Sequence, residues 1–246
     1  MGRLVILSGP SCVGKGPLCA ALRKFYPKLA GGLRSVVLYN SRTPRPGERE
    51  GVDYYFRPRG EIEEYRRKPG FVVLDVRGDL QAFGLNDLRQ ALVTDEVLFE
   101  GNPFIGRELL TNPALSSIPK LSVFLSPLSK DEIIYFSAPE RKVSLPDLVT
   151  DIMRRKLLRR MQRQKGIPSR GDLDEIERRA GSACTELREA WRYQHVIPNH
   201  DGEDSDNWDA FYYPIGDARR ALLAFAELLA GRIPPGVEQW QEALIP

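Results

Sequence analysis

The start of the chain contains the feature that most constrains the fold: an apolar run, a glycine-rich loop and a helical stretch in direct succession. Residues 3–9 read RLVILSG, which is typical of a buried strand in a parallel sheet. The loop GPSCVGKG follows over residues 9–16, and Leu18, Leu22 and Phe25 then recur at helical spacing. This order predicts an α/β fold with a phosphate site where the strand meets the helix.

The loop matches the pattern GxxxxGK, in which each retained residue has a chemical task. Gly9 and Gly14 allow backbone N–H groups to turn toward a polyphosphate, and Lys15 reaches its β and γ phosphates. The helix that follows adds the positive end of its dipole. We therefore expect an ATP-binding loop with a catalytic Lys15, formed by Gly9, Ser11, Cys12, Val13, Gly14, Lys15 and Gly16.

One position of the loop departs from the pattern. A Ser or Thr normally follows the lysine and binds Mg²⁺ through its hydroxyl, whereas this chain has Gly16. Two interpretations are open. Either the loop no longer binds a triphosphate productively, or Mg²⁺ is held by the nucleotide, water and a carboxylate from elsewhere in the chain. The sequence identifies no metal ligand.

Predicted strands and helices alternate along the rest of the chain. The strands are expected at Ser35–Tyr39, Phe71–Val76, Glu96–Glu100, Leu121–Leu125 and His195–Ile197, and the helices at Asn86–Leu92, Leu148–Arg163, Leu173–Trp191 and Asp217–Leu229. Such alternation predicts a three-layer sandwich, with a mainly parallel central sheet covered by helices on both faces.

Two segments interrupt this alternation. Residues 126–146 contain several prolines, and residues 200–213 begin with a stretch, 200–209, that has five acidic residues and no Lys or Arg. We expect that stretch to be a solvated loop. Residues 231–246 are expected to form a tail that docks loosely or through Trp240. The longest apolar stretches are too short to cross a bilayer, and the three cysteines lack metal-site spacing, so a cytoplasmic location is expected.

A second basic motif lies at residues 41–56, which read SRTPRPGEREGVDYYF. Arg42 and Arg45 flank a proline-containing turn, so the two guanidinium groups can hold one phosphate from two sides. The hydroxyl of Tyr54 can act as a third donor. For a shorter fragment of this composition, an Arg/Pro-rich surface loop is the alternative.

The same segment resembles the signature TTRxPRxGExxGxDYxF of the guanylate kinases, which are P-loop nucleoside monophosphate kinases. The chain keeps R-T-P-R, P-G-E, G-V-D-Y and the final Phe56, while Leu38 replaces a serine of the family. The resemblance implies that Arg42, Arg45 and Tyr54 bind the phosphate of GMP. It also implies a small subdomain that binds the nucleoside monophosphate, at about residues 35–92.

The segment that reads the acceptor base is less similar to the family. Members have Phe-x-Glu and later Tyr-Gly-Ser, where this chain reads FVVLDVRGDLQAFGL from Phe71. Phe83 stands in place of the tyrosine and Leu85 in place of the serine. Asp75 is the nearest carboxylate that could accept hydrogen bonds from guanine. Glu100, in VLFEGNPFIG, aligns with an acidic strand end of the family, and we expect it to contact the base, to organise a metal, or to face solvent.

Residues 151–170 contain eight basic residues and one acid, a local charge of +7 in a chain whose total is +3. Such a segment is often a solvated helix face, or it binds nucleic acid or a membrane surface. It also resembles the guanylate kinase lid, expected at about residues 151–190. That resemblance implies that Arg160, Arg170 and Arg179 neutralise the charge of the transition state, and that Asn199 lies beside the adenine of ATP.

The resemblance extends from Arg3 to about Leu229 and implies one domain at residues 1–230. It implies an ATP-dependent kinase with ATP and Mg²⁺ as cofactors, which converts GMP to GDP. Two alternatives stay open: a non-catalytic nucleotide-binding or interaction module, and a kinase for another mononucleotide. Nucleotides are the expected partners; no membrane or nucleic-acid partner is expected, and the sequence indicates no protein partner.

Overall fold

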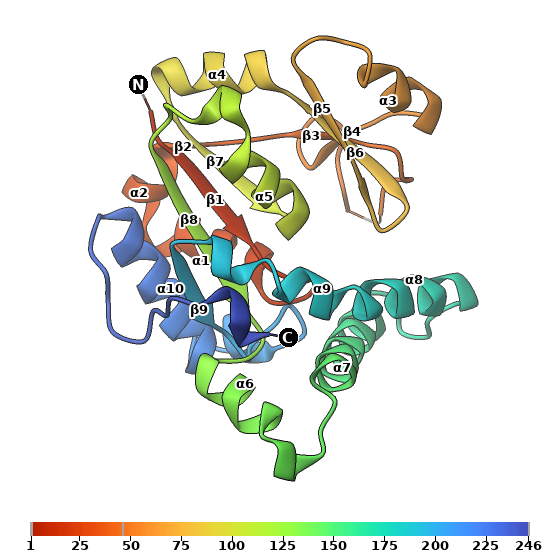
Figure 1. Cartoon of the computed structure of the whole chain (residues 1–246), viewed down its shortest axis with the longest axis vertical. Coiled ribbons are helices and arrows are strands. Elements are labelled where there is room, and N and C mark those ends of the chain that lie inside the picture. Colours follow the sequence, from red (N-terminus) through yellow and green to blue (C-terminus); the bar gives the residue numbers. More distant parts are fainter. Residues whose placement is uncertain (1, 46, 246) are drawn as a thin grey trace.

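The computed structural model describes residues 2–45 and 47–245, and its centre is a five-stranded sheet (Figure 1). The strands lie in the order β2 (Leu33–Ser35), β7 (Glu96–Gly101), β1 (Leu4–Ser8), β8 (Lys120–Ser126) and β9 (His195–Pro198). Every neighbouring pair is parallel. The predicted α/β fold with a mainly parallel central sheet is therefore confirmed.

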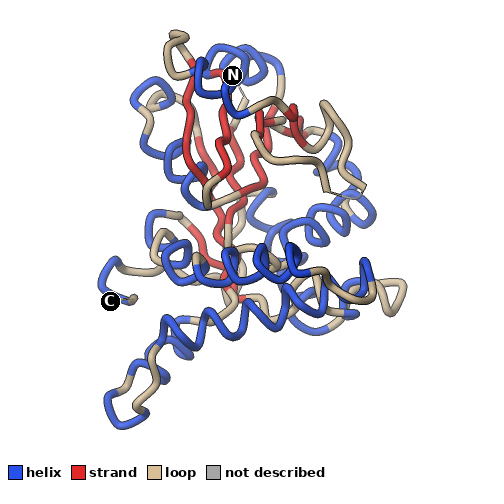
Figure 2. Tube along the Cα trace, turned by 90° about the vertical axis from the view of Figure 1, so that its right-hand side faces the viewer, coloured by secondary structure: helices blue, strands red, loops and turns tan. Residues whose placement is uncertain are grey.

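Successive side chains of β1 face opposite sides of the sheet, and each side is covered by a layer of helices. Leu4 and Ile6 pack on one side with α4 (Leu85–Thr94), α5 (Pro103–Thr111) and α9 (Ala183–Leu187). Val5 and Leu7 pack on the other side with α1 (Lys15–Phe25) and α10 (Gly216–Leu229), and α2 (Pro27–Gly31) lies next to α1. All four strand residues are fully buried. Figure 2 shows the red strands between blue helices, which is the arrangement expected of a buried parallel sheet.

A second, mixed sheet lies beside the central one. Its order is β4 (Tyr54–Phe56), β3 (Leu38–Asn40), β6 (Asp79–Gly84) and β5 (Phe71–Val76), and α3 (Arg59–Tyr65) covers its outer face. The prediction of one strand at Ser35–Tyr39 is wrong. The chain leaves the central sheet after Ser35 and enters the small sheet at Leu38, so the apolar run is divided between two sheets.

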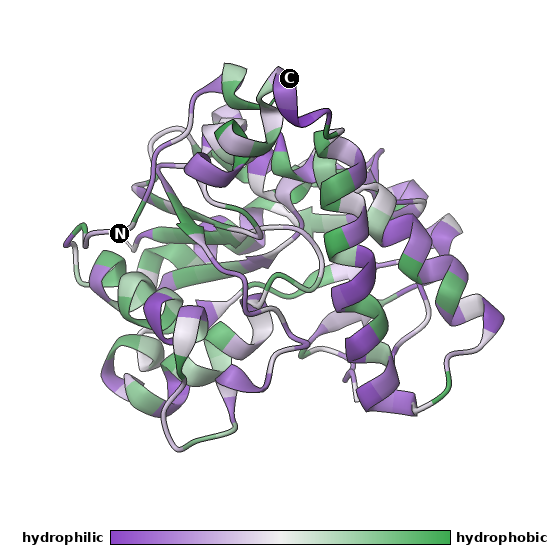
Figure 3. Ribbon diagram, turned by 90° about the horizontal axis from the view of Figure 1, so that it is seen from below, coloured by the Kyte–Doolittle hydropathy of each residue, from purple (hydrophilic) through white to green (hydrophobic). Residues whose placement is uncertain are grey.

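The segment predicted to form the lid contains α7 (Leu145–Lys165) and α8 (Arg170–Gly181), which pack against each other at the lower right of Figure 1. Val149, Met153 and Leu157 bury one side of α7 in the larger core cluster. Figure 3 shows largely green strands at the centre and purple, hydrophilic stretches along the surrounding helices. The single helix predicted at Leu173–Trp191 is wrong, because α8 ends at Gly181 and α9 is a separate short helix. Gly and Ser at positions 181 and 182 are weak helix formers.

The first of the two interrupting segments is more ordered than its composition suggests. Residues 126–146 contain α6 (Lys130–Ser137), which begins with a capping box between Ser129 and Glu132. The pattern S-x-x-E that produces this capping box is visible in the sequence. In the tail, Trp240 is buried and Glu238 pairs with Val196 of β9. No helix in the described part of the chain has the length and apolar character needed to span a bilayer.

Candidate active site

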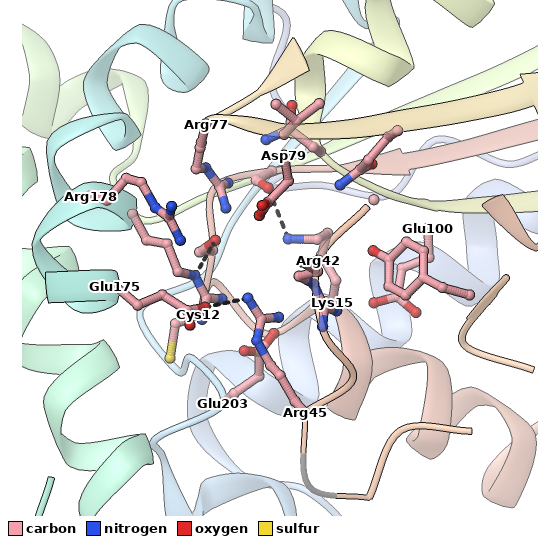
Figure 4. A pocket seen from close by; sticks show the side chains of 18 residues that line it. Cys12, Lys15, Arg42, Arg45, Arg77, Asp79, Glu100, Glu175, Arg178 and Glu203 are labelled. Carbon is pink, nitrogen blue, oxygen red and sulfur yellow. Dashed lines mark hydrogen bonds and ion pairs between the residues drawn. The ribbon is translucent and has the colours of Figure 1, made fainter. Parts of the chain in front are cut away.

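A polar cavity of about 170 Å³ lies where the phosphate loop, the small sheet and the lid meet (Figure 4). Its lining comes from six segments: Gly9, Ser11, Cys12 and Lys15; Arg42, Arg45 and Tyr54; Val76, Arg77, Asp79 and Gln81; Glu100, Gly101 and Asn102; Glu175, Arg178 and Arg179; and Glu203. The fold therefore brings the phosphate loop and the Arg42–Arg45 motif to one cavity. A wider cavity of about 620 Å³ adjoins it between the Arg42–Arg45 turn and α7 and α8.

The phosphate loop has the conformation that its glycines allow. Gly9 and Gly14 have φ values of 153° and 106°, and a Cβ at Gly9 would lie 2.4 Å from the carbonyl oxygen of Leu125. The Nζ of Lys15 donates hydrogen bonds of 2.8 Å to the carbonyl oxygens of Gly9 and Pro10. Burial lowers the pKa of Lys15, while nearby carboxylates act in the opposite direction. The ammonium group is thus held inside the loop.

Glu100 lies beside the position that departs from the loop pattern. A Cβ added at Gly16 would lie 4.0 Å from Oε1 of Glu100, so this carboxylate borders the space that a Ser or Thr side chain would enter. Glu100 is exposed at the end of β7, yet the surrounding protein atoms desolvate its carboxylate and raise its pKa, and the charge of Lys15 opposes that shift. Within residues 2–45 and 47–245, no group of three His, Cys, Asp or Glu side chains could hold a metal ion.

The acceptor-loop arginines are each paired with a carboxylate of the chain. Arg42 donates bonds of 2.7 and 2.6 Å to the two oxygens of Glu48, and its guanidinium lies 5.1 Å from the ring centroid of Tyr54. Arg45 forms an ion pair with Glu175 of α8, which connects this turn to the lid. Burial raises the pKa of Tyr54, so its hydroxyl remains a hydrogen-bond donor.

Two of the three predicted lid arginines lie at these cavities. Arg179 lines the smaller one, and its Nε donates to Oγ of Ser11 over 3.1 Å. Burial, together with the positive charges of the neighbouring Arg160 and Arg45, lowers the pKa of Arg179 to about 9. Arg160 lines the wider cavity. Arg170 is exposed at the first position of α8 and lines neither cavity.

Of the residues predicted to recognise the base, Glu100 lines the smaller cavity, whereas Asp75 and Phe83 do not. The carboxylate of Asp75 is half exposed and accepts a hydrogen bond of 2.7 Å from the backbone of Gly78. Side chains alternate along a strand, so Asp75 points away from the face on which its neighbour Val76 lines the cavity. Phe83 packs in the larger core cluster.

Asn199 is buried against the phosphate loop. Its Nδ2 donates bonds of 2.7 Å to the carbonyl oxygens of Val13 and Asp201. Both donors of the amide are therefore used within the chain. The expected contact with adenine stays a prediction.

Sequence reasoning missed three residues of the β5–β6 hairpin. Arg77 has a φ of 60° in the turn and pairs with the fully buried Glu186 over 2.6 Å. Asp79 and Gln81 are two residues apart on β6 and both line the cavity. Gln81 is 8% exposed, and its amide makes no hydrogen bond within the described residues. The period of two along β6 is the signal that could have found Asp79 and Gln81.

The expectation of a solvated loop at residues 200–209 is wrong. Asp204 is 4% exposed and lies near two cations of α7, at 3.7 Å from Lys156 and 3.3 Å from Arg159. Glu203 reaches the cavity and pairs with Arg160. These acids are buried because they neutralise the basic face of the lid helix, which composition alone does not reveal.

Comparison with known proteins supports the resemblance. The family model for guanylate kinase matches residues 1–74. Guanylate kinases of Corynebacterium diphtheriae and Corynebacterium efficiens are 30% and 31% identical over 207 and 203 residues, which are 82% and 81% of this chain and 90% and 88% of those proteins. The guanylate kinase of a Synechococcus strain is 54% identical, but only over 61 residues, 25% of this chain and 26% of that protein.

The fold agrees with a solved structure. Guanylate kinase from Anaplasma phagocytophilum matches 95% of this chain with 88% of its own, with a TM-score of 0.52 and 18% identity. Because the two Corynebacterium relatives align with most of both chains, and because the shared motifs meet at one cavity, the chain belongs to the guanylate kinase family.

Proposed function

We propose that the protein transfers the γ-phosphoryl group of ATP to the phosphate of a nucleoside monophosphate, with GMP as the acceptor and GDP and ADP as products. One observation carries the proposal: the phosphate-loop lysine, the acceptor-loop arginines and a lid arginine all line a single cavity. Phosphoryl transfer needs two phosphates held together and cations around the moving group, so such convergence is its main structural requirement.

Each part of the cavity has a role in this reaction. Lys15 and the loop amides hold the donor phosphates, and Arg42, Arg45 and Tyr54 hold the acceptor phosphate. Arg179 stabilises the charge on the equatorial oxygens, and Arg160 assists from the adjoining cavity. The pair between Arg45 and Glu175 joins the acceptor side to the lid, which helps to exclude water.

The residues present fit Mg²⁺ through one carboxylate. Glu100 borders the space left by Gly16, and Mg²⁺ commonly keeps several water ligands and binds through one or two carboxylates and substrate phosphates. Glu100 would hold the ion, which when bound neutralises charge on the donor phosphates.

A Gly16→Ser substitution tests this assignment. We expect the Mg²⁺ concentration for half-maximal rate to fall by about threefold or more, because the new hydroxyl adds a ligand beside Glu100 in space that is open. The measurement is a magnesium titration of the rate at saturating ATP and acceptor. An unchanged titration curve, in a variant with wild-type thermal stability, would show that the ion lies elsewhere.

We further propose that Asp79 and Gln81, rather than Asp75, select the acceptor. The Asp79 carboxylate can accept from N1–H and N2–H of guanine, and the free amide of Gln81 can donate to O6. Asp79→Asn should raise the KM for GMP at least about tenfold and leave the KM for ATP within about twofold. Asp75→Asn is the matched control, since that carboxylate points away. Equal effects of the two substitutions would contradict the assignment.

The proposed reaction itself is tested by ADP release with ATP, Mg²⁺ and each of GMP, dGMP, AMP, CMP and UMP. We expect release that depends on GMP. Turnover with a different nucleotide would identify another mononucleotide kinase. Tight ATP binding with no turnover for any acceptor would support a binding module instead.

A further inference from the structure

The acidic loop at residues 200–209 is fixed directly on the phosphate loop. Asn199, just before it, is bonded to Val13, and a Cβ at Gly202 would lie 2.2 Å from the carbonyl oxygen of Cys12. Nε1 of Trp208 donates to the carbonyl oxygens of Asp201 and Gly202 over 2.9 and 3.0 Å. The backbone of this loop therefore has a defined position relative to the phosphate site.

From that backbone, Glu203 enters the cavity that contains Gly9 and Lys15 (Figure 4). Its Oε2 lies 2.6 Å from Nη1 of Arg160, and the two side chains are only 18% and 16% exposed. Although burial raises it, the charges of Arg160, Lys15 and Arg179 hold the pKa of Glu203 below its usual range. The ionised carboxylate of Glu203 thus places a negative charge of the chain itself beside the phosphate loop.

The cations around Glu203 retain capacity for a further anion. The Nε of Arg160 is buried and has no hydrogen-bond partner within the described residues. Arg179 is also buried, and its positive charge is only partly neutralised, because the nearest oxygen of Glu175 lies 3.6 Å away. An unpartnered, buried donor is costly, so this arrangement favours the arrival of a ligand oxygen.

We propose that Glu203 is an internal competitor of the donor phosphates: its carboxylate occupies a place among Lys15, Arg160 and Arg179 that a phosphate oxygen takes when a polyphosphate binds. Two anions this close in a buried site repel strongly, so the Glu203 side chain turns away as the donor enters. The movement is confined to the side chain, since the loop backbone is held on the phosphate loop. The inference rests on the proposed function only in requiring that a polyphosphate binds here.

The test compares Glu203→Gln with Asp206→Asn by calorimetric titration of inorganic tripolyphosphate and of ATP in buffer with EDTA, and of ATP again in buffer with Mg²⁺. Asp206 is in the same loop and pairs with Arg163 of α7, but it is 75% exposed and outside the cavity. Asp206→Asn therefore removes one negative charge from the loop, as Glu203→Gln does, without changing the cavity. We expect Glu203→Gln to bind both ligands about tenfold more tightly than wild type. Asp206→Asn should stay within about twofold of wild type.

Affinity that is unchanged or weaker in Glu203→Gln overturns the proposal, as does an equal gain in Asp206→Asn. A loss of ATP affinity in Glu203→Gln that occurs only with Mg²⁺ would show that Glu203 is a metal ligand, and also overturns it. If Glu203→Gln does not fold, Glu203→Asp should give a smaller gain, because its shorter side chain withdraws from Arg160. Absence of GMP turnover would count against the proposed function and leave these binding results intact.

Discussion

Replacing Lys15 by alanine is expected to lower kcat/KM for ATP by about a thousandfold or more. The ammonium group is buried within the loop, where a charge acts on the donor phosphates in a low effective dielectric. Water cannot replace it without reorganising the loop. The measurement is the rate of ADP release in a coupled assay at saturating acceptor.

Lys24→Ala is the matched control for that substitution. Lys24 is on the same helix but is exposed at its last turn, where its Nζ lies 4.7 Å from the ring centroid of Tyr212. Its rate should stay within about twofold of wild type. If both variants retain wild-type turnover, the cavity is not the site of phosphoryl transfer, and the proposed function is wrong.

Arg179→Met is the second substitution with a large expected effect, a fall in kcat of about 10³-fold with a much smaller change in the KM values. Arginines that neutralise the transferring group are worth about 10³ to 10⁵ in rate. Arg179 is suited to this role because it is 7% exposed, touches Ser11 of the phosphate loop and has a pKa that burial and neighbouring arginines lower to about 9. A buried cation of this kind stabilises negative charge that develops beside it in the transition state more strongly than an exposed one would.

Arg155→Met serves as the comparison for Arg179. Arg155 is on the solvent side of α7, with its side chain 64% exposed and paired to Asp151. We expect wild-type kcat for this variant. A rise in the KM for GMP without loss of kcat in Arg179→Met would instead assign Arg179 to ground-state binding of the acceptor. Thermal unfolding of both variants separates either result from a loss of folded protein.

The parts of the molecule that the sequence predicts well are those fixed by local pattern. The strand, glycine loop and helix at residues 3–25 follow from apolar periodicity and from the backbone freedom of Gly9 and Gly14. The placement of Arg42 and Arg45 follows from the motif at residues 41–56, in which many positions match the guanylate kinase signature. In both segments, the residues that determine the conformation are neighbours in the chain.

The parts that sequence reasoning missed depend on partners distant in the chain. Composition identifies a carboxylate but not the face of the hairpin from which it points, so the sequence does not show that Asp79 lines the cavity while Asp75 points away from it. The burial of Glu203 and Asp204 depends on cations of α7 that are more than 40 residues away. Local charge favours solvent for such acids, and only the tertiary pairing reverses that preference.

The pairing of the tail with the central sheet has a consequence for association between copies. β9 is an edge strand, and an unpaired edge offers its N–H and C=O groups to any other extended chain. Here Val196 exchanges two hydrogen bonds of 2.8 Å with Glu238, and Trp240 covers the adjoining apolar surface. At the opposite edge, β2 has only three residues. Both borders of the central sheet thus offer little to a strand from a second molecule, which protects this sheet against edge-to-edge aggregation.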